Sequence, residues 1–297
     1  MKSFENVPKT PDSIRQFARM CLVERGLDRK VELTRQAVDA WRDGQLKLEP
    51  LDHGPVTPGE IEARKSVVPG LPPGLVLTSP TKVRRRGFGS AHGKAAFVHA
   101  IAHIEWNAIN LAWDAVWRFD AMPREYYDDW SRVAAEEAEH FAMLRGRLLE
   151  LGSDYGTMPA HAGLWQTAEQ TRHDLLARMA LVPRVLEARG LDVTPGLIAK
   201  LRQLPGGGDE ATAAILDVVL REEVGHVRIG SRWFHYLCEK RGVAPAAAFE
   251  EAVRTHFRGR TRAITDPLPR RLRIEAGFRE DELDALARIA SEEAGPS

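Results

Sequence analysis

Two short stretches decide the fold of this chain: Val133-Ala-Ala-Glu-Glu-Ala-Glu-His-Phe-Ala-Met-Leu144 and Leu220-Arg-Glu-Glu-Val-Gly-His-Val-Arg-Ile229. Each contains a glutamate followed three residues later by a histidine, which on an α-helix places both side chains on one face. A single Glu-x-x-His is a weak signal because both residue types are common. Two copies on separately predicted helices are much stronger, and they indicate a buried cluster of acidic and imidazole groups.

Long helical segments contain and accompany the two stretches. The sequence predicts four of them, at about residues 95–119, 123–151, 164–190 and 209–241. A proline at position 123 suits a helix start, so the first two should form an antiparallel hairpin. The third and fourth are joined through Pro195 and the glycines at 206–208, with a short helix at about 196–204 between them. Asp209 is the expected N-cap of the fourth segment.

The segments on either side predict flanking extensions. Residues 1–93 begin with two short helices that break near Gly26, followed by a proline-rich irregular connection from about residue 48. Residues 242–297 predict a C-terminal helical extension with helices at about 244–257 and 280–293. We therefore expect an all-α protein in which a four-helix bundle over 94–241 carries helical extensions at both ends.

The composition is typical of a globular protein, with 43% hydrophobic and 28% charged residues. The 42 basic and 42 acidic side chains cancel, which argues against nucleic acid or an acidic membrane surface as partner. The two cysteines have no Cys-x-x-Cys partner, so a thiolate metal site is not indicated. There is neither an apolar leader nor an apolar run of about 18 residues. A cytoplasmic location away from membranes is the expectation.

A glutamate on each of the other two long segments completes a known design. Di-iron and di-manganese carboxylate proteins take one Glu from each of two helices and a Glu-x-x-His from each of the other two. Glu105 fits because its neighbours one and two turns away are all apolar, and a carboxylate there is costly to bury without a cation. On the third segment the candidate is Glu187, with Pro183 predicting a local kink.

Each candidate ligand has an ordinary alternative when it is considered alone, since core carboxylates and histidines are commonly hydrogen-bonded within the protein. Their joint occurrence favours a metal site, because four carboxylates and two imidazoles offset two divalent ions and suit iron or manganese. We expect Glu136, Glu139 and Glu222 to be solvated charges on the helices. For Glu136 the reason is its charged neighbours, whereas Glu222 and Glu223 both have apolar neighbours, so Glu223 is chosen by the repeated three-residue spacing. His99 and His103 should project away from the site. The predicted metal ligands are Glu105, Glu137, His140, Glu187, Glu223 and His226.

The stretch from Arg84 to Phe119, together with residues 135–141, 159–165 and 221–227, resembles the ferritin-like family catalogued as domain-of-unknown-function family 455. The resemblance extends from about Cys21 to Gly242. It implies a ferritin-like four-helix bundle with a carboxylate-bridged dimetal centre, and the six ligands named above occupy the matching positions. A more distant similarity is to the di-iron tRNA hydroxylase family.

The ligand set and the resemblance together lead us to expect a non-haem dimetal oxidoreductase. It would hold two iron ions, with manganese or a mixed Mn/Fe pair as alternatives, and activate O₂ to hydroxylate or oxidise a small-molecule substrate with electrons from a donor protein. A ferritin-type iron oxidation or storage protein and a metal-stabilised binding or scaffold protein are the competing hypotheses. The loop at 155–165 is either a gate or a packed crossover. The basic stretches at 82–86 and 258–273 either pair with acidic groups or bind RNA, tRNA included.

Overall fold

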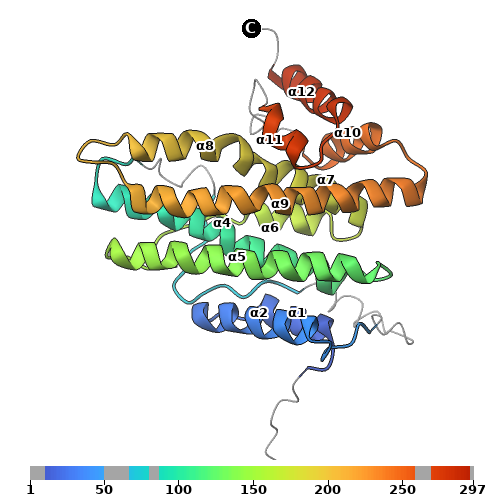
Figure 1. The fold of residues 1–297 in the computed structure, drawn as a ribbon, viewed down its shortest axis with the longest axis horizontal. Coiled ribbons are helices and arrows are strands. Elements are labelled where there is room, and N and C mark those ends of the chain that lie inside the picture. Colours follow the sequence, from blue (N-terminus) through green and yellow to red (C-terminus); the bar gives the residue numbers. More distant parts are fainter. Residues whose placement is uncertain (1–10, 50–66, 80–86, 258–268, 295–297) are drawn as a thin grey trace, which may run out of the picture.

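The computed structural model describes residues 11–49, 67–79, 87–257 and 269–294, and this part of the chain is helical (Figure 1). Within it, strand-like pairing is limited to two isolated bridges, one of which joins Ser13 to Lys47. The all-α expectation is confirmed. The helices are α1 (Ile14–Val23), α2 (Leu27–Arg42), α4 (Ala91–Arg118), α5 (Arg124–Glu150), α6 (Gly163–Gln170), α7 (Leu175–Leu181), the π-helical turn η2 (Val182–Glu187), α8 (Ala188–Arg202), α9 (Glu210–Arg241), α10 (Pro245–His256), α11 (Arg270–Glu275) and α12 (Glu280–Ala294).

Helices α4, α5 and α9 form the centre of the molecule. Helix α4 packs along α5 as the predicted hairpin, and α9 packs against α5 on one side and against α7, η2 and α8 on the other. In Figure 1, α1 and α2 lie below α5, whereas α10, α11 and α12 gather on the opposite side, beyond α9. Most residues of α4 are buried, because it has neighbours on several sides. Among the described helices, none has the length and apolar character needed to cross a membrane.

The prediction of one continuous third helix at about 164–190 is wrong, because the chain forms several shorter elements there. Helix α6 ends before Thr171, whose hydroxyl bonds back to the carbonyls of Thr167 and Ala168, and Asp174 then caps α7 by accepting a hydrogen bond from the N–H of Leu176. This capping residue is the sequence signal that our prediction missed.

The downstream boundary of the third segment is also corrected. Helix α8 follows directly from η2 and runs through Pro195 to Arg202, although we expected a break at this proline. Pro195 lies on the exposed side of α8, where water can take the carbonyl that its ring leaves without a partner.

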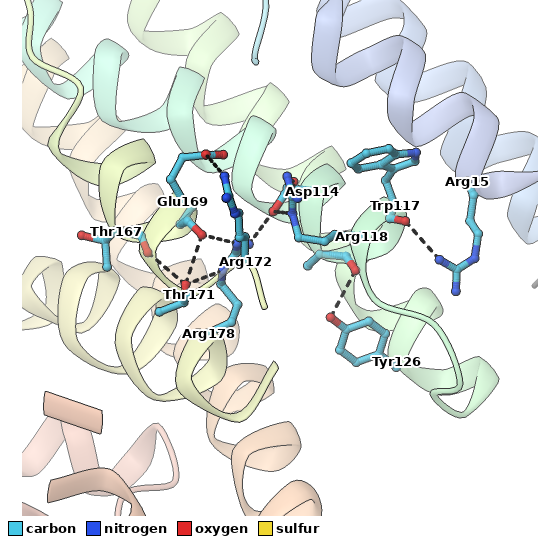
Figure 2. A network of polar contacts seen from close by, with 12 residues as sticks. Arg15, Asp114, Trp117, Arg118, Tyr126, Thr167, Glu169, Thr171, Arg172 and Arg178 are labelled. Carbon is cyan, nitrogen blue, oxygen red and sulfur yellow. Dashed lines mark hydrogen bonds and ion pairs between the residues drawn. The ribbon is translucent and has the colours of Figure 1, made fainter. Parts of the chain in front are cut away.

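A buried ion-pair network ties the broken segment to α4 (Figure 2). The fully buried carboxylate of Asp114 accepts bonds from Arg118, one turn further along α4, and from Nη1 of Arg178 on α7 at 2.5 Å. Arg178 also donates to the Thr171 hydroxyl and to the carbonyl of Ala168. Burial would raise the pKa of Asp114, but the two guanidinium groups hold it below its usual value. The network fixes α7 against α4.

The N-terminal hairpin is packed into the same core. The break near Gly26 is confirmed, and both helices contact the central pair. Arg15 donates to the carbonyls of Trp117 and Phe119, which satisfies the C-terminal end of α4. The fully buried Lys30 donates from Nζ to Asn110 on α4 at 2.5 Å. These polar anchors hold α1 and α2 against the helix that carries Glu105.

Parts of the predicted connections lie outside the described residues. These are residues 50–66 of the proline-rich connection, the whole basic stretch at 82–86, and residues 258–268 of the C-terminal basic stretch. Of the arginines that are described there, Arg270 pairs with Glu280 and Asp284, and Arg273 pairs with Asp192. These two arginines are therefore engaged in ion pairs within the chain.

Candidate metal centre

The three central helices bring five of the six predicted ligands together. Glu105 comes from α4, Glu137 and His140 from α5, and Glu223 and His226 from α9; all five side chains are buried. The Glu-x-x-His spacing works as expected, because each glutamate and its histidine lie one turn apart on the face that points into the core. Each of the five is at most 7% exposed.

The ligand atoms form two overlapping groups that share Glu137. One oxygen or nitrogen from each of Glu105, Glu137 and His140 lies within 4.8 Å of the others, and the same holds for Glu137, Glu223 and His226. Nδ1 of His140 lies 3.5 Å from Oε2 of Glu105 and 3.4 Å from Oε2 of Glu137. Nδ1 of His226 lies 2.9 Å from Oε1 of Glu137 and 3.8 Å from Oε2 of Glu223. Glu137 therefore stands between the two groups, with one oxygen toward each histidine.

Glu187 lies at the edge of the cluster and belongs to neither three-residue group. Its carboxyl interacts electrostatically with Glu137 and His226, and its charge also acts on Glu223. It sits at the end of η2, the π-helical turn that begins one residue before Pro183, so the irregularity expected from this proline is present. The turn packs against α9, the helix that carries Glu223 and His226.

The six side chains are unusually poor in hydrogen-bond partners. Among the described residues, thirteen buried side-chain nitrogen or oxygen atoms have no partner, and seven of them belong to these six side chains. The short contact between His226 Nδ1 and Glu137 lies off the hydrogen-bonding direction, so these two atoms count among the seven. Buried polar atoms are normally satisfied, so this concentration requires an explanation such as a bound cation. The seven atoms are Glu105 Oε2, both carboxylate oxygens of Glu137, His140 Nδ1, Glu187 Oε2, Glu223 Oε2 and His226 Nδ1.

The charge state of the cluster points in the same direction. Burial and the neighbouring Glu137 raise the pKa of Glu105 and of Glu187 to about 8, and they raise that of Glu223 well above its usual value. Desolvation and like charge are the two effects that disfavour ionised carboxylates, and bound cations would reverse both. The pKa of Glu137 moves the other way: burial would raise it, but His226 and His140 lower it below its usual value. The cluster is thus unfavourable for ionised Glu105, Glu187 and Glu223 alone, and dications would favour all four carboxylates in their ionised form.

Two further glutamates correct our reading of the helix surfaces. We expected Glu136 and Glu222 to be solvated charges, yet each accepts a hydrogen bond from a cluster histidine. Oε2 of Glu222 lies 2.9 Å from Nε2 of His140, and Oε2 of Glu136 lies 2.7 Å from Nε2 of His226. The bonds cross between α5 and α9, so the glutamate preceding each Glu-x-x-His serves the histidine of the other motif. Such carboxylates fix the ring and its tautomer, leaving Nδ1 free for a ligand.

The nearby histidines and the 155–165 loop are occupied elsewhere. Nε2 of His99 accepts the N–H of Gly156, and Nδ1 of His103 lies 2.8 Å from the Tyr155 hydroxyl. The ring of Tyr155 packs against those of Trp106 and Phe141, which adjoin Glu105 and His140 in sequence. The loop therefore packs against the wall of the cluster, while a gating role for it stays a prediction.

The fold and this cluster define an all-helical protein with a buried glutamate–histidine site. The chain belongs to the family described as protein of unknown function DUF455, whose model matches residues 23–284. An uncharacterized protein of Haemophilus influenzae is 45% identical over 252 residues, which cover 82% of this chain and 84% of that protein. No solved structure matches this chain. The membership expected from the motifs around Glu105, His140 and His226 is confirmed.

Proposed function

We propose that this protein is a ferritin-like, non-haem dimetal oxidoreductase. Glu105, Glu137, His140, Glu187, Glu223 and His226 would hold two iron ions. When bound, the iron pair would supply an oxygen-binding position and the electrons to activate O₂. The reaction class is hydroxylation or oxidation of a small-molecule substrate, with a donor protein returning the electrons.

The observation that carries the proposal is the set of seven buried ligand atoms that face one another without a hydrogen-bond partner. Each comes from one of the six side chains that the sequence predicts as metal ligands. The donor set is oxygen and imidazole nitrogen without thiolate, which suits iron and manganese. The two groups of atoms share Glu137, which is the arrangement needed for one carboxylate to contact two ions.

The surrounding residues prepare the ligands for that role. Glu136 and Glu222 hold the Nε2 sides of His226 and His140, so both rings present Nδ1 inward. Their side chains are 34% and 30% exposed, which gives the two imidazoles a connection to solvent through a carboxylate. The buried Asp114 network and the Arg15 cap keep α4, and with it Glu105, in place.

Metal analysis tests the site. The chain purified without chelator, or loaded anaerobically with Fe(II), should carry about two metal ions. Glu137→Gln should lose most of this metal, whereas Glu139→Gln on the exposed face of the same helix should retain it. Failure of the wild-type chain to take up transition metal, or equal retention by both variants, would refute the site.

Oxygen consumption tests the reaction class. The Fe(II)-loaded chain should consume O₂ and change its absorption spectrum, and repeated turnover should require an electron source. A large iron load without any need for electrons would favour the storage alternative. A metal-loaded chain that stays inert to O₂ for hours would leave only a scaffolding role for the metal.

A further inference from the structure

The C-terminal extension contacts η2, the turn that carries Glu187, through a buried arginine. Arg184 lies in this turn and is fully buried. Its Nη2 donates to Oε2 of Glu282 on α12 at 2.7 Å, and its Nε donates to the hydroxyl of Ser231 on α9. Three phenylalanine rings surround the guanidinium at 4.2 to 4.6 Å from their centroids. They come from α9, α10 and the α11–α12 connection, namely Phe234, Phe249 and Phe278.

A second buried arginine binds the chain on both sides of Glu187. Arg273 on α11 donates from Nη1 to the backbone carbonyl of Arg184, three residues before Glu187. Its Nε and Nη2 donate to both carboxylate oxygens of Asp192 on α8, five residues after Glu187. A paired, planar guanidinium of this kind fixes geometry as well as charge. The segment is therefore held from the C-terminal side at a point on each side of the candidate ligand.

Helix α9 supports the opposite side of the same turn. An ideal Cβ on Gly230 would lie 2.4 Å from Cβ and Cγ of Pro183, so the proline ring occupies the space that a side chain would need. Gly230 follows His226 by one turn on α9. The turn is thus enclosed between α9, which carries Glu223 and His226, and the two C-terminal helices.

We propose that α11 and α12 act as a clamp on η2, in which Arg184, Arg273 and Glu282 are positioning residues that place Glu187 for the metal. This inference rests on the proposed dimetal site. Because η2 packs against α9, the helix that carries Glu223 and His226, the clamp should affect the ion on that side much more than the other ion. The group made of Glu105, Glu137 and His140 lies on α4 and α5. The hydrogen bonds described above for the three clamp residues go to α8, α9, α12 and η2 instead.

The first test measures the turn itself in metal-free protein. Glu282→Gln removes the carboxylate charge from Arg184, and Arg273→Lys keeps the positive charge but loses the planar fork. Hydrogen exchange of peptides covering residues 182–192 should become about tenfold faster or more in both variants. Arg270→Gln is the matched control, because Arg270 joins α11 to α12 through exposed pairs with Glu280 and Asp284.

The second test measures the affinity for each Mn(II) equivalent by calorimetric titration under anaerobic conditions. In the clamp variants the second equivalent should bind about 10- to 100-fold more weakly, and the first should change by no more than about twofold. A clamp that is merely structural would weaken both equivalents together, or neither. Arg273→Lys is the milder change, and it answers the question if Glu282→Gln fails to fold.

The outcomes separate the clamp from the site it serves. Unchanged exchange at 182–192 in both variants, or equal weakening of both metal equivalents, would overturn the clamp while leaving the dimetal site intact. A wild-type chain that binds no metal would overturn the dimetal site and with it the clamp's role toward Glu187, whatever the exchange rates show. Faster exchange together with selective loss of the second equivalent supports the proposal.

Discussion

The crossed glutamate–histidine pairs make the sharpest prediction. Changing Glu136 to Gln should weaken the metal ion held by the other motif, through His226, and not the ion held by its own neighbour His140. The reason is the 2.7 Å hydrogen bond between Glu136 Oε2 and His226 Nε2, which joins α5 to α9. An amide can still contact the ring, but it carries no charge and it orients the imidazole less strongly.

The expected size follows from the exposure of the carboxylate. Loss of such an outer partner costs about 10- to 100-fold in metal affinity. The Glu136 side chain is 34% exposed, so water screens part of its charge, and the lower end of the range applies. We expect a loss of about tenfold, or about 1.4 kcal/mol of binding free energy.

The assay is a double-mutant cycle on Mn(II) affinity, measured by calorimetry. Glu136→Gln should cost about tenfold in the His140→Ala background, where only the His226 side remains. It should cost almost nothing in the His226→Ala background, because its partner is already gone. Glu139→Gln, on the exposed face of α5, controls for the loss of one negative charge from the helix. Equal costs in both backgrounds, or a cost no larger than that of Glu139→Gln, would refute the crossed pairing.

Three further predictions concern the frame around the site. Asp114→Asn should cost about 3–5 kcal/mol in urea denaturation, because it leaves the buried guanidinium of Arg178 without its counter-charge; a cost below about 1 kcal/mol would contradict the role given to this pair. Burial lowers the pKa of Lys30 to about 7 from an ordinary 10.5, so the unfolded chain binds the extra proton and stability should rise as the pH is raised from about 7 toward 10. Lys30→Met should flatten this rise in urea midpoints, and an unchanged slope would show that Lys30 does not cause it. Gly230→Ala places a methyl group 2.4 Å from the proline ring of η2 and should cost about 1–3 kcal/mol, measured by thermal unfolding. Gly225→Ala on the same helix meets nothing within 4 Å and should not destabilise, so equal losses in the two variants would point to a general effect of alanine.

Much of the arrangement could be predicted because it depends on local periodicity. The motifs around Glu137 and Glu223 fix which face of α5 and α9 turns inward, and the apolar stripe around Glu105 does the same for α4. The third segment was harder, because the competition between continuing the helix and capping at Asp174 depends on tertiary partners such as Arg178. The sequence pattern contains the cap but not its partner.

The crossed carboxylates could not be assigned for a related reason. The charged neighbours of Glu136 on its own helix predict a side chain that faces solvent, because helical periodicity contains no information about a second helix. Whether a glutamate at the border of a face reaches a histidine on another helix depends on how α5 and α9 pack. The doubled glutamate in Glu-Glu-x-x-His is a sequence signal for this pairing, since both motifs carry the extra glutamate immediately before the ligand.

The exchange of partners between α5 and α9 also constrains how such a chain can change over evolutionary time. The first glutamate of each Glu-Glu-x-x-His motif depends for its role on the last residue of the other, so a substitution at Glu222 is felt at His140 and one at Glu136 at His226. A drift toward a single-metal protein by decay of one motif would therefore weaken metal binding by the surviving half as well. We expect relatives to keep both motifs or to lose both.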